Sequence, residues 1–359
     1  MSDLMSGTVN YSDLQKKYKN FMIPAIKIKV SGTDLVNSMK LAVVSMNMNL
    51  STKSAGSCVI TIAGLYDPKS HSLKSEAKSK FALGTIVTVE LGYASSTECV
   101  FKGFVLKMGV SFTDKALLTV TLMDARRLMM TGAARHKLYD VKNYSDAVKE
   151  ILSDYSKLGS TKIDATDDKL KSPVSQNSTD YDFITKSLIE EGRTDREFFI
   201  VADKIYFRKP RSEKSPITTM TYGKELLTFS ESSEYKDLKI EVYGYDHEMQ
   251  KQVKGSESVS KPSGQKSVLS KSSVMMIVDS MIDSDAKAGE KAKIIAKREE
   301  MRGNKASAMT IGLPQLIPGR FIKVSGLEGM ADKSYYITDV EHVFTEDEFI
   351  TRLEMTFLN

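Results

Sequence analysis

Hydrophobic and polar positions alternate along residues 24–124. In IPAIKIKV the apolar side chains Ile26, Ile28 and Val30 alternate with two lysines, and this period of two is typical of a strand with one buried face. Similar runs follow, separated by Gly, Ser, Asp and Lys, namely VSMNMNL, SCVITIAGL, TIVTVELGY, CVFKGFVLKMGVSF and ALLTVTLMD. About six short strands at this spacing predict a small antiparallel barrel or sandwich.

The pattern changes to a helical period in residues 131–215. SDAVKEILSDYSKLG predicts a helix that Ser145 or Asp146 caps and Gly159 ends. Its apolar face is formed by Ala147, Val148, Ile151, Leu152 and Tyr155.

A second helix is predicted in QNSTDYDFITKSLIEEG, residues 176–192. Ser178 or Thr179 can cap it, and two aspartates in its first turn face the positive end of the helix dipole. Gly192 stops it. EFFIVADKIYFRKP then predicts a β-hairpin that turns at Asp203-Lys204.

Strand patterns return from residue 216, in ITTMTYG and DLKIEVYGYD. A stretch rich in Ser and Lys and free of aromatic residues, residues 251–273, predicts a solvated loop, and residues 274–303 predict a helix. RFIKVSGL, SYYITDVEHVF and EFITRLEMTFL are the closing strands.

Two parts of the chain resemble each other. LGTIVTVELG, VFKGFVLKMGVSF and ALLTVTLM in residues 83–123 have the same order of strands and turns as PGRFIKVSGLEG, SYYITDVEHVF and FITRLEMTF in residues 318–357. Gly84 lies 28 positions before Phe112, and Gly319 lies 25 positions before Phe344. A second similarity joins LTVTLMDARRLM to LKIEVYGYDHEM. The sequence therefore predicts an internal duplication.

The expected fold is α+β and mainly β, with two related small antiparallel β-barrel domains bracketing an α/β segment. We expect an N-terminal arm at 1–20, a first barrel at 21–130, the α/β domain at 131–215 and a second barrel at 216–359. The loop at 251–273 and the helix at 274–303 interrupt the second barrel.

Composition and charge narrow the class of protein. The chain has 359 residues, 41 % of them hydrophobic, and a net charge of +5. No segment has the roughly 20 apolar residues that a membrane span needs, and the N-terminus has no hydrophobic signal region, so we expect no membrane insertion by the chain itself. Residues 251–305 hold the whole excess of positive charge, in a stretch without aromatics to stack on bases.

Few residues offer reactive chemistry. Cys58 and Cys99 each lie in a strand-like run and are expected to be buried. None of the four histidines has a partner at ligand spacing, so we expect no metal or cofactor. His342 is expected to be structural. Asp180, Asp182, Glu190 and Glu191 could supply an acid/base pair for glycoside cleavage, with Asp180 and Glu190 as the candidates, although first-turn acids also stabilise a helix and the other two suit its solvated end.

With these elements placed, the sequence resembles the phage late control protein D family, which includes baseplate hubs of contractile tails and the hub part of type VI secretion spike proteins. The first motif is the helix and hairpin just described, through Gln176, Asp180, Phe183, Leu188, Glu190, Glu191 and Gly192. The second is the closing strands, through Pro318, Gly319, Gly326, Tyr336, Ile337, Val340, His342, Thr351 and Leu353.

The resemblance implies a non-enzymatic baseplate hub that assembles as a homotrimer. Two similar barrels in each of three chains would form a pseudo-six-fold ring between a trimeric spike and a hexameric inner tube. The chain ends after its last strand, so the spike is expected to be a separate protein. Other expected partners are the tube or tube-initiator protein and a wedge or tape-measure protein. We expect assembly in the cytoplasm and a place in a phage tail or extracellular contractile particle.

Two other functions remain as alternatives. One is a cell-wall glycan hydrolase subunit that uses Asp180 and Glu190. The other is a nucleic-acid-binding β-barrel protein that uses the basic segment, with binding that weakens steeply as salt rises.

Overall fold

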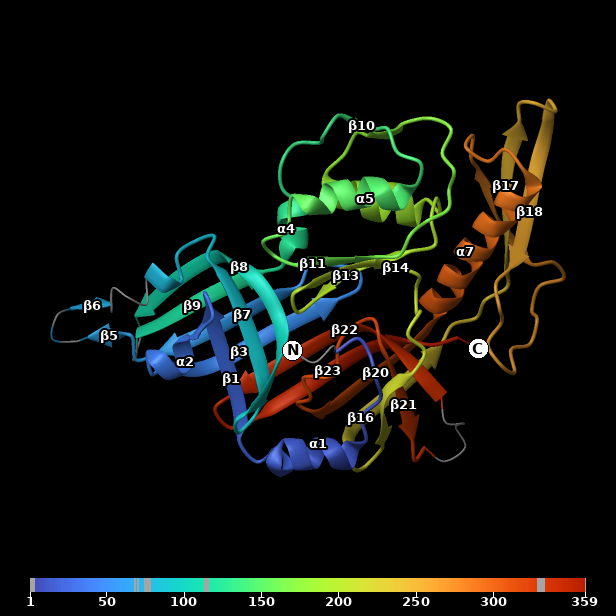
Figure 1. Cartoon of the computed structure of the whole chain (residues 1–359). Helices are drawn as coiled ribbons and strands as arrows, with labels where there is room; N and C mark the ends of the chain where they lie inside the picture. The colour runs from blue at the N-terminus through green and yellow to red at the C-terminus, as the bar shows by residue number, and fades with distance from the viewer. Residues whose placement is uncertain are drawn as a thin grey trace.

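A computed structural model describes residues 4–67, 69, 71–73, 79–112, 116–327 and 333–358. Part of the expected N-terminal arm, residues 1–3, and Asn359 at the chain end lie outside the described residues. Figure 1 shows a mainly β protein, with the green middle segment above a large sheet and an orange helix and strands standing beside it. The large sheet has 13 strands in the described residues, and most neighbouring strands in it are antiparallel.

One half of this sheet is built from the first third of the chain. Its six main strands, which we call the first strand unit, are β1 (Pro24–Val30), β3 (Ala42–Ser51), β4 (Ser57–Ala63), β7 (Ile86–Tyr93), β8 (Ser96–Phe112) and β9 (Ala116–Met123). Their order in the sheet is β1-β7-β8-β9-β4-β3. The six strands predicted from alternation are thus confirmed.

The other half comes from the last third of the chain. The second strand unit consists of β15 (Pro216–Thr221), β16 (Leu226–Ser233), β20 (Asn304–Ile311), β21 (Phe321–Ser325), β22 (Lys333–Thr345) and β23 (Phe349–Thr356). Its order is β15-β21-β22-β23-β20-β16. Both units therefore place their strands, numbered along the chain, in the order 1-4-5-6-3-2.

Details of the backbone repeat between the units as well. Gly84 and Gly319 have φ of +83° and +86°. The N–H of Gly84 donates to the carbonyl of Val105, and the N–H of Gly319 donates to that of Ile337, each over 2.9 Å. A β-bulge directly follows Val105 in β8 and Ile337 in β22. These matches support the predicted duplication. One pairing differs, because β1 and β7 are antiparallel whereas β15 and β21 are parallel.

The two units are not separate in the sheet. β3 pairs with β22 in antiparallel register, from Ser51 opposite Asp339 to Ser45 opposite Thr345. The strands of the two expected barrels therefore form one continuous sheet, and no strand pairing closes either unit into a barrel within the described residues. A single large cluster of buried apolar side chains runs through both units, for example Met48, Ile60 and Val340.

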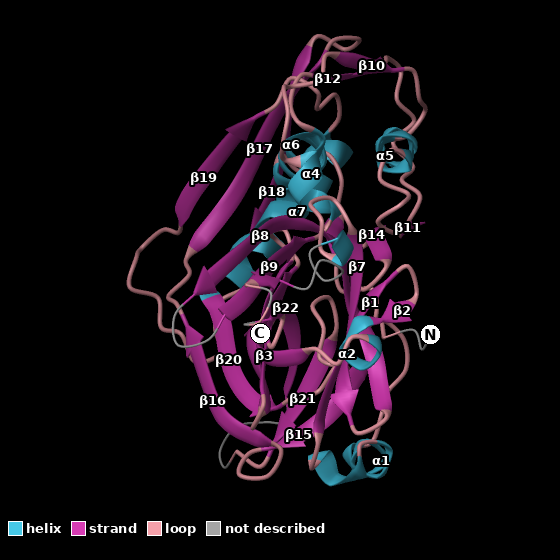
Figure 2. Cartoon of the chain, turned by 90° about the vertical axis from the view of Figure 1, so that its left-hand side faces the viewer, coloured by secondary structure: helices cyan, strands magenta, loops and turns pink. Residues whose placement is uncertain are grey.

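The middle segment, residues 131–215, packs on the sheet around a core of its own (Figure 2). Its elements, with the preceding short helix, are α4 (Ala125–Met129), β10 (Lys137–Tyr139), α5 (Tyr144–Ser153), β11 (Ser160–Ile163), β12 (Val174–Gln176), α6 (Asp180–Asp182), η2 (Phe183–Glu190), β13 (Glu197–Val201) and β14 (Lys204–Arg208). Three short strands here, β10, β11 and β12, were not predicted, because runs of three or four residues show no period.

Three local predictions in this segment need correction. The cap of α5 is Asn143, and the helix ends at Ser153, before Gly159. The predicted caps Ser145 and Asp146 lie inside its first turn. The hairpin turns at Ala202-Asp203, because Val201 pairs with Lys204, and Ala202 takes the left-handed conformation with φ of +52°.

Residues 234–303 form an insert between β16 and β20. β17 (Leu238–Asp246), β18 (Lys251–Ser258) and β19 (Ser273–Val278) make a three-stranded sheet, and α7 (Asp285–Gly303) packs on it. The prediction of a loop over 251–273 is wrong for residues 251–258, which form β18, and the helix predicted from 274 begins at Asp285 instead. The similarity of LKIEVYGYDHEM to β9 is also not a structural one, because β17 lies outside the large sheet.

The N-terminal residues are anchored on the second strand unit. The guanidinium of Arg320, fully buried, donates to the carbonyls of Leu4 and Gly7. The Tyr18 hydroxyl accepts from Gln315 Nε2 over 2.6 Å. The remaining short elements are α1 (Tyr11–Lys17), η1 (Lys19–Phe21), β2 (Thr33–Asp34), α2 (Leu35–Ser38), β5 (Tyr66–Asp67) and β6 (Ser72–Leu73). Among the described helices, none is long and apolar enough to cross a membrane.

Candidate functional site

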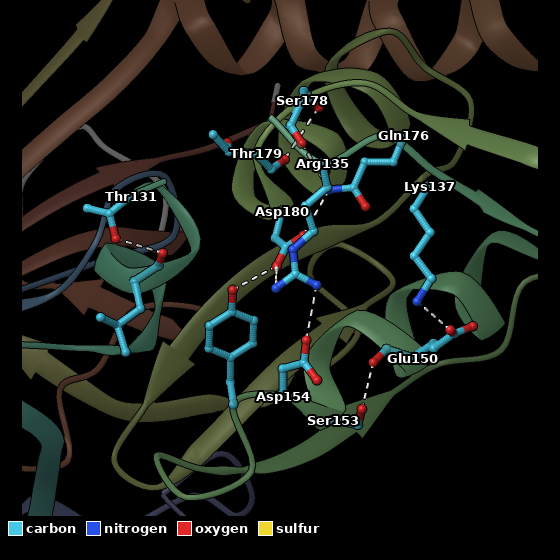
Figure 3. Close-up of polar contacts among 12 residues, drawn as sticks. Thr131, Arg135, Lys137, Glu150, Ser153, Asp154, Gln176, Ser178, Thr179 and Asp180 are labelled. Carbon is cyan, nitrogen blue, oxygen red and sulfur yellow. Dashed lines mark hydrogen bonds and ion pairs between the residues drawn. The ribbon is translucent and has the colours of Figure 1, made fainter. Parts of the chain in front are cut away.

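The first motif forms a buried polar network at the end of β12 (Figure 3). Gln176 is fully buried, and its Nε2 donates to Asp180 Oδ1 over 2.8 Å and to the carbonyl of Ser178 over 3.0 Å. Its Oε1 accepts from the Tyr139 hydroxyl over 2.6 Å. The Gln176 side chain therefore joins β10, β12 and α6.

Asp180, 3 % exposed, is the centre of this network. Its Oδ2 accepts from the Tyr155 hydroxyl over 2.7 Å and lies 3.2 Å from Arg135 Nη2. Arg135 also donates to Asp154 over 3.0 Å (Figure 3). Burial raises the pKa of Tyr155, and its hydrogen bond to Asp180 adds to the rise. Burial and the nearby Asp180 raise the pKa of Tyr139 to about 12.

The helix after Asp180 follows the sequence in outline. Thr179 is its cap, with Oγ1 accepting from the Asp182 N–H over 3.2 Å. Its main part, η2, has π-helical hydrogen bonding. Phe183 stacks on Tyr139 with ring centroids 5.9 Å apart, and Leu188 is fully buried in the same core.

The end of this helix meets the insert. Gly192 has φ of +72° and lies close to Lys291 of α7, so its left-handed conformation lets the chain turn beside that helix. Arg298 of α7 donates to the carbonyls of Ile189 and Glu190. Glu191 pairs with Arg193 over 2.9 Å at the surface. The backbone at the end of this helix therefore contacts α7, whereas the Glu191 carboxylate pairs within the middle segment.

The second motif holds the β13–β14 hairpin against the second strand unit. The hydroxyl of buried Tyr336 donates to Glu197, which also accepts from Arg208 Nε over 2.8 Å. Arg208 donates to the carbonyl of Gly319 and lies over the ring of Phe199, 4.9 Å from its centroid. Burial raises the pKa of the Glu197 carboxyl, with Arg208 opposing the rise.

The other residues of the second motif have distinct places. His342 is fully buried, with Nδ1 2.9 Å from Thr351 Oγ1, and burial lowers its pKa to about 3. Pro318 is buried before Gly319. Gly326 has φ of +79° beside Thr221. The structure thus brings Gln176 and Asp180 together in one network, and Gly319 and Tyr336 together in another.

Sequence reasoning missed the partners of these motif residues. Arg135, Tyr155, Glu197 and Arg208 are bonded to them but lie in other parts of the chain. The pattern marked Tyr155 only as part of an apolar helix face, and it marked none of the four as a polar partner. Both cysteines are buried as predicted, and burial raises the pKa of Cys99 to about 12. Within the described ranges, no group of three or more His, Cys, Asp or Glu could hold a metal ion.

Large apolar side chains are exposed on two strands. In β8 they are Leu106, at the bulge, and Val110 and Phe112 after it, and in β19 they are Val274, Met275, Met276 and Val278. Exposed apolar groups in a row mark contact surfaces more often than isolated ones do. The networks above are buried, so these strands are the better candidates for contacts with other chains.

Comparisons with known proteins agree with this fold. A tail protein from Neisseria meningitidis matches with a TM-score of 0.67 and 12 % identity, over 93 % of this chain and 97 % of that one. The 43 kDa tail protein of prophage MuSo2 from Shewanella oneidensis matches with a TM-score of 0.66 and 10 % identity, over 92 % and 97 %. An E. coli component of the type VI secretion system matches with a TM-score of 0.55 and 13 % identity, over 92 % and 76 %.

The expected resemblance to tail hub proteins is therefore confirmed for the fold. A family model described as "Alg8 N-terminal domain" matches residues 21–346. No curated protein matches the sequence.

Proposed function

The chain belongs to the family described as the Alg8 N-terminal domain, and we propose that it is a structural hub protein of a phage tail or a related contractile injection particle. The fold shared with tail proteins and with a type VI secretion component supports this proposal. The hub is a homotrimer that joins a separate trimeric spike to a hexameric inner tube.

The observation that carries this proposal is the duplicated strand unit. Each chain has two units with the same strand order, two bulges at equivalent places and the same glycine turn. Three chains supply six units, which is the number that a hexameric tube ring requires for one contact each. Each unit is one of the two related β-domains of the hub, and the trimer closes around a cyclic axis.

The proposed hub is not an enzyme. Asp180 is buried and already bonded to Gln176, Tyr155 and Arg135. Glu190 is at the far end of the same helix, ten residues on, which at the rise of a helix is on the order of 10–15 Å. Glycosidase carboxyl groups lie about 5–9.5 Å apart around an open sugar site, so this pair does not favour the hydrolase alternative.

The nucleic-acid alternative is weakened in a similar way. Several cations of residues 251–305 are paired with acids of the insert, including Lys254 with Glu241 over 2.9 Å and Lys261 with Asp237 over 3.0 Å. Paired cations offer less charge to phosphates.

The native mass of the purified full chain tests the proposal. We expect a trimer of about 120 kDa from a 39.9 kDa chain, or trimers that form when the spike protein of the same particle is added. A monomer under both conditions contradicts the hub function. A non-enzymatic hub should show no wall-degrading activity in the parent chain. The D180N and E190Q variants should keep the same native mass.

A further inference from the structure

The free edges of the sheet point to the contact between neighbouring copies. Within one chain the two units meet where β3, the second strand of the first unit, pairs with β22, the fifth strand of the second unit. The counterpart of β3 in the second unit is β16, and the counterpart of β22 in the first unit is β8. In the described residues β16 from Thr228 on pairs only with β20, and β8 beyond Val105 pairs only with β9.

Bulges fix which residues of these strands correspond. A bulge lies between Val105 and Lys107 in β8 and between Ile337 and Asp339 in β22, so residues 107–112 correspond to residues 339–344. Another bulge separates Val43 from Ser45 in β3, and an equivalent one separates Leu226 from Thr228 in β16. Residues 228–234 therefore correspond to residues 45–51.

Burial differs between the corresponding positions as a missing strand predicts. Val340, His342 and Phe344 of β22 are 2 %, 0 % and 6 % exposed beneath β3. Of their counterparts in β8, Met108 is half-buried against the core, whereas Val110 and Phe112 are 36 % and 64 % exposed, although Phe112 also contacts Tyr66. An apolar strand edge without a partner favours addition of another strand.

We propose that β16 of one copy adds to the free edge of β8 of the next copy, antiparallel and in the register of β3 on β22. The inference rests on the proposed function for the number of copies, three. The three contacts between chains and the three β3–β22 pairings within chains then form six equivalent junctions. Such a head-to-tail contact closes into a ring when its rotation divides the circle.

The transferred register is chemically complementary. It places Phe229 opposite Phe112 and Glu234 opposite Lys107. Neither of these two charged side chains has an ion-pair partner within the described part of the chain. Glu231 falls opposite Val110, and its carboxylate already accepts from Lys333 over 2.8 Å and from Tyr335, so no uncompensated charge meets the apolar residue.

A disulfide tests this register. Within one chain, Thr52 and Thr338 form a hydrogen-bonded pair, because the Thr52 N–H donates to the carbonyl of Thr338 over 2.8 Å. Hydrogen-bonded and non-hydrogen-bonded pairs alternate along antiparallel strands, so Asn47 and Val343, five positions further along, form a non-hydrogen-bonded pair. Ser230 and Ser111 are their counterparts between copies. The Cα atoms of opposed residues at such sites lie about 4.5 Å apart, within the range that a disulfide spans.

The S111C/S230C double variant of the full chain is oxidised and run on a non-reducing gel. We expect disulfide-linked oligomers up to a trimer that disappear on reduction. We expect none from either single variant or from S111C/S232C, which is two residues out of register. N47C/V343C is the positive control: its disulfide forms within one chain, so the variant should lose two free thiols and still run as a monomer on the non-reducing gel. Absence of linked S111C/S230C oligomers, while the control closes its disulfide, overturns the inference.

Native mass separates this failure from a failure of the hub proposal. An unlinked trimer of about 120 kDa would leave the proposed function intact and show that another surface joins the copies. An unlinked monomer would contradict both.

A second pair of variants tests the same contact between β16 and β8 without cysteines. F112E should lower the trimer fraction more than tenfold, whereas L138E, at a side chain 69 % exposed in the middle segment, should leave it unchanged. Equal trimer fractions in F112E and L138E would contradict the proposed contact between β16 and β8.

Discussion

Gly84 and Gly319 occupy the same place in the two strand units, but their surroundings differ. A Cβ added at Gly84 would meet nothing within 4 Å, whereas one at Gly319 would lie 2.5 Å from Phe199 Cζ. The backbone turn is thus common to both units, while only the second is closely covered there by the β13–β14 hairpin. A duplicated frame can keep its turns and bulges while each copy acquires different neighbours.

Residues that correspond when the two units are aligned on their bulges also differ in their surroundings. Phe104 of the first unit packs into the apolar core of the middle segment. Its counterpart Tyr336 bonds to Glu197 in a buried ion-pair network. At these two corresponding positions the middle segment therefore makes an apolar contact with the first unit and a charged contact with the second, and this difference can be tested by substitution.

The largest effect is expected from E197A. This change leaves the Arg208 guanidinium, 8 % exposed, without its carboxylate. Removing one partner of a buried pair costs about 3–5 kcal/mol in the free energy of unfolding, measured by urea denaturation. E191A is the matched control, because its surface pair with Arg193 contributes about 0–1 kcal/mol. Equal losses in the two variants would show that the Glu197 network does not stabilise the contact.

Alanine at the two glycines comes next. G84A should destabilise by about 1–2 kcal/mol, the cost of a left-handed non-glycine residue. G319A adds overpacking against Phe199, about 1–3 kcal/mol more. Thermal or urea unfolding of both variants measures the difference, and a smaller loss for G319A than for G84A would contradict the comparison.

The smallest effect is a pH dependence that belongs to the second unit. The pKa of His342 is about 3 in the folded chain and 6.5 ordinarily. Between these two pH values the unfolded chain therefore binds a proton on His342 that the folded chain does not bind. Stability should therefore fall as pH drops, by about 2 kcal/mol between pH 7 and pH 5. H342Q should remove this component of the slope. V110Q changes the corresponding exposed position and should leave the slope unchanged, and a parental slope in H342Q would rule out His342 as its source.

Sequence patterns predicted much of this frame, for physical reasons. Alternation identified β1, β3, β4, β7, β8 and β9 because each buries one face. It missed β16, whose residues LLTFSESS lack alternation because one edge of that strand and most of its side chains are exposed. It also missed β18, whose serines and lysines pair with β17 away from the main core.

The motif residues were found by resemblance, but their roles depend on partners far away in the chain. Asp180 was interpreted as a first-turn acid, which is correct for its place in the helix. Its burial depends on Tyr155 and Arg135, which lie 25 and 45 residues before it. Similarly, nothing near Tyr336 in sequence indicates Glu197. Local periodicity carries no information about such long-range polar contacts.

End-on electron microscopy of the purified assembly tests the central claim most directly. Three chains with two equivalent units each predict a three-fold ring with six similar lobes around a central opening. A ring with any other symmetry, or particles with no ring in the presence of the spike protein, would contradict the proposal that the duplicated strand unit adapts a three-fold spike to a six-fold tube.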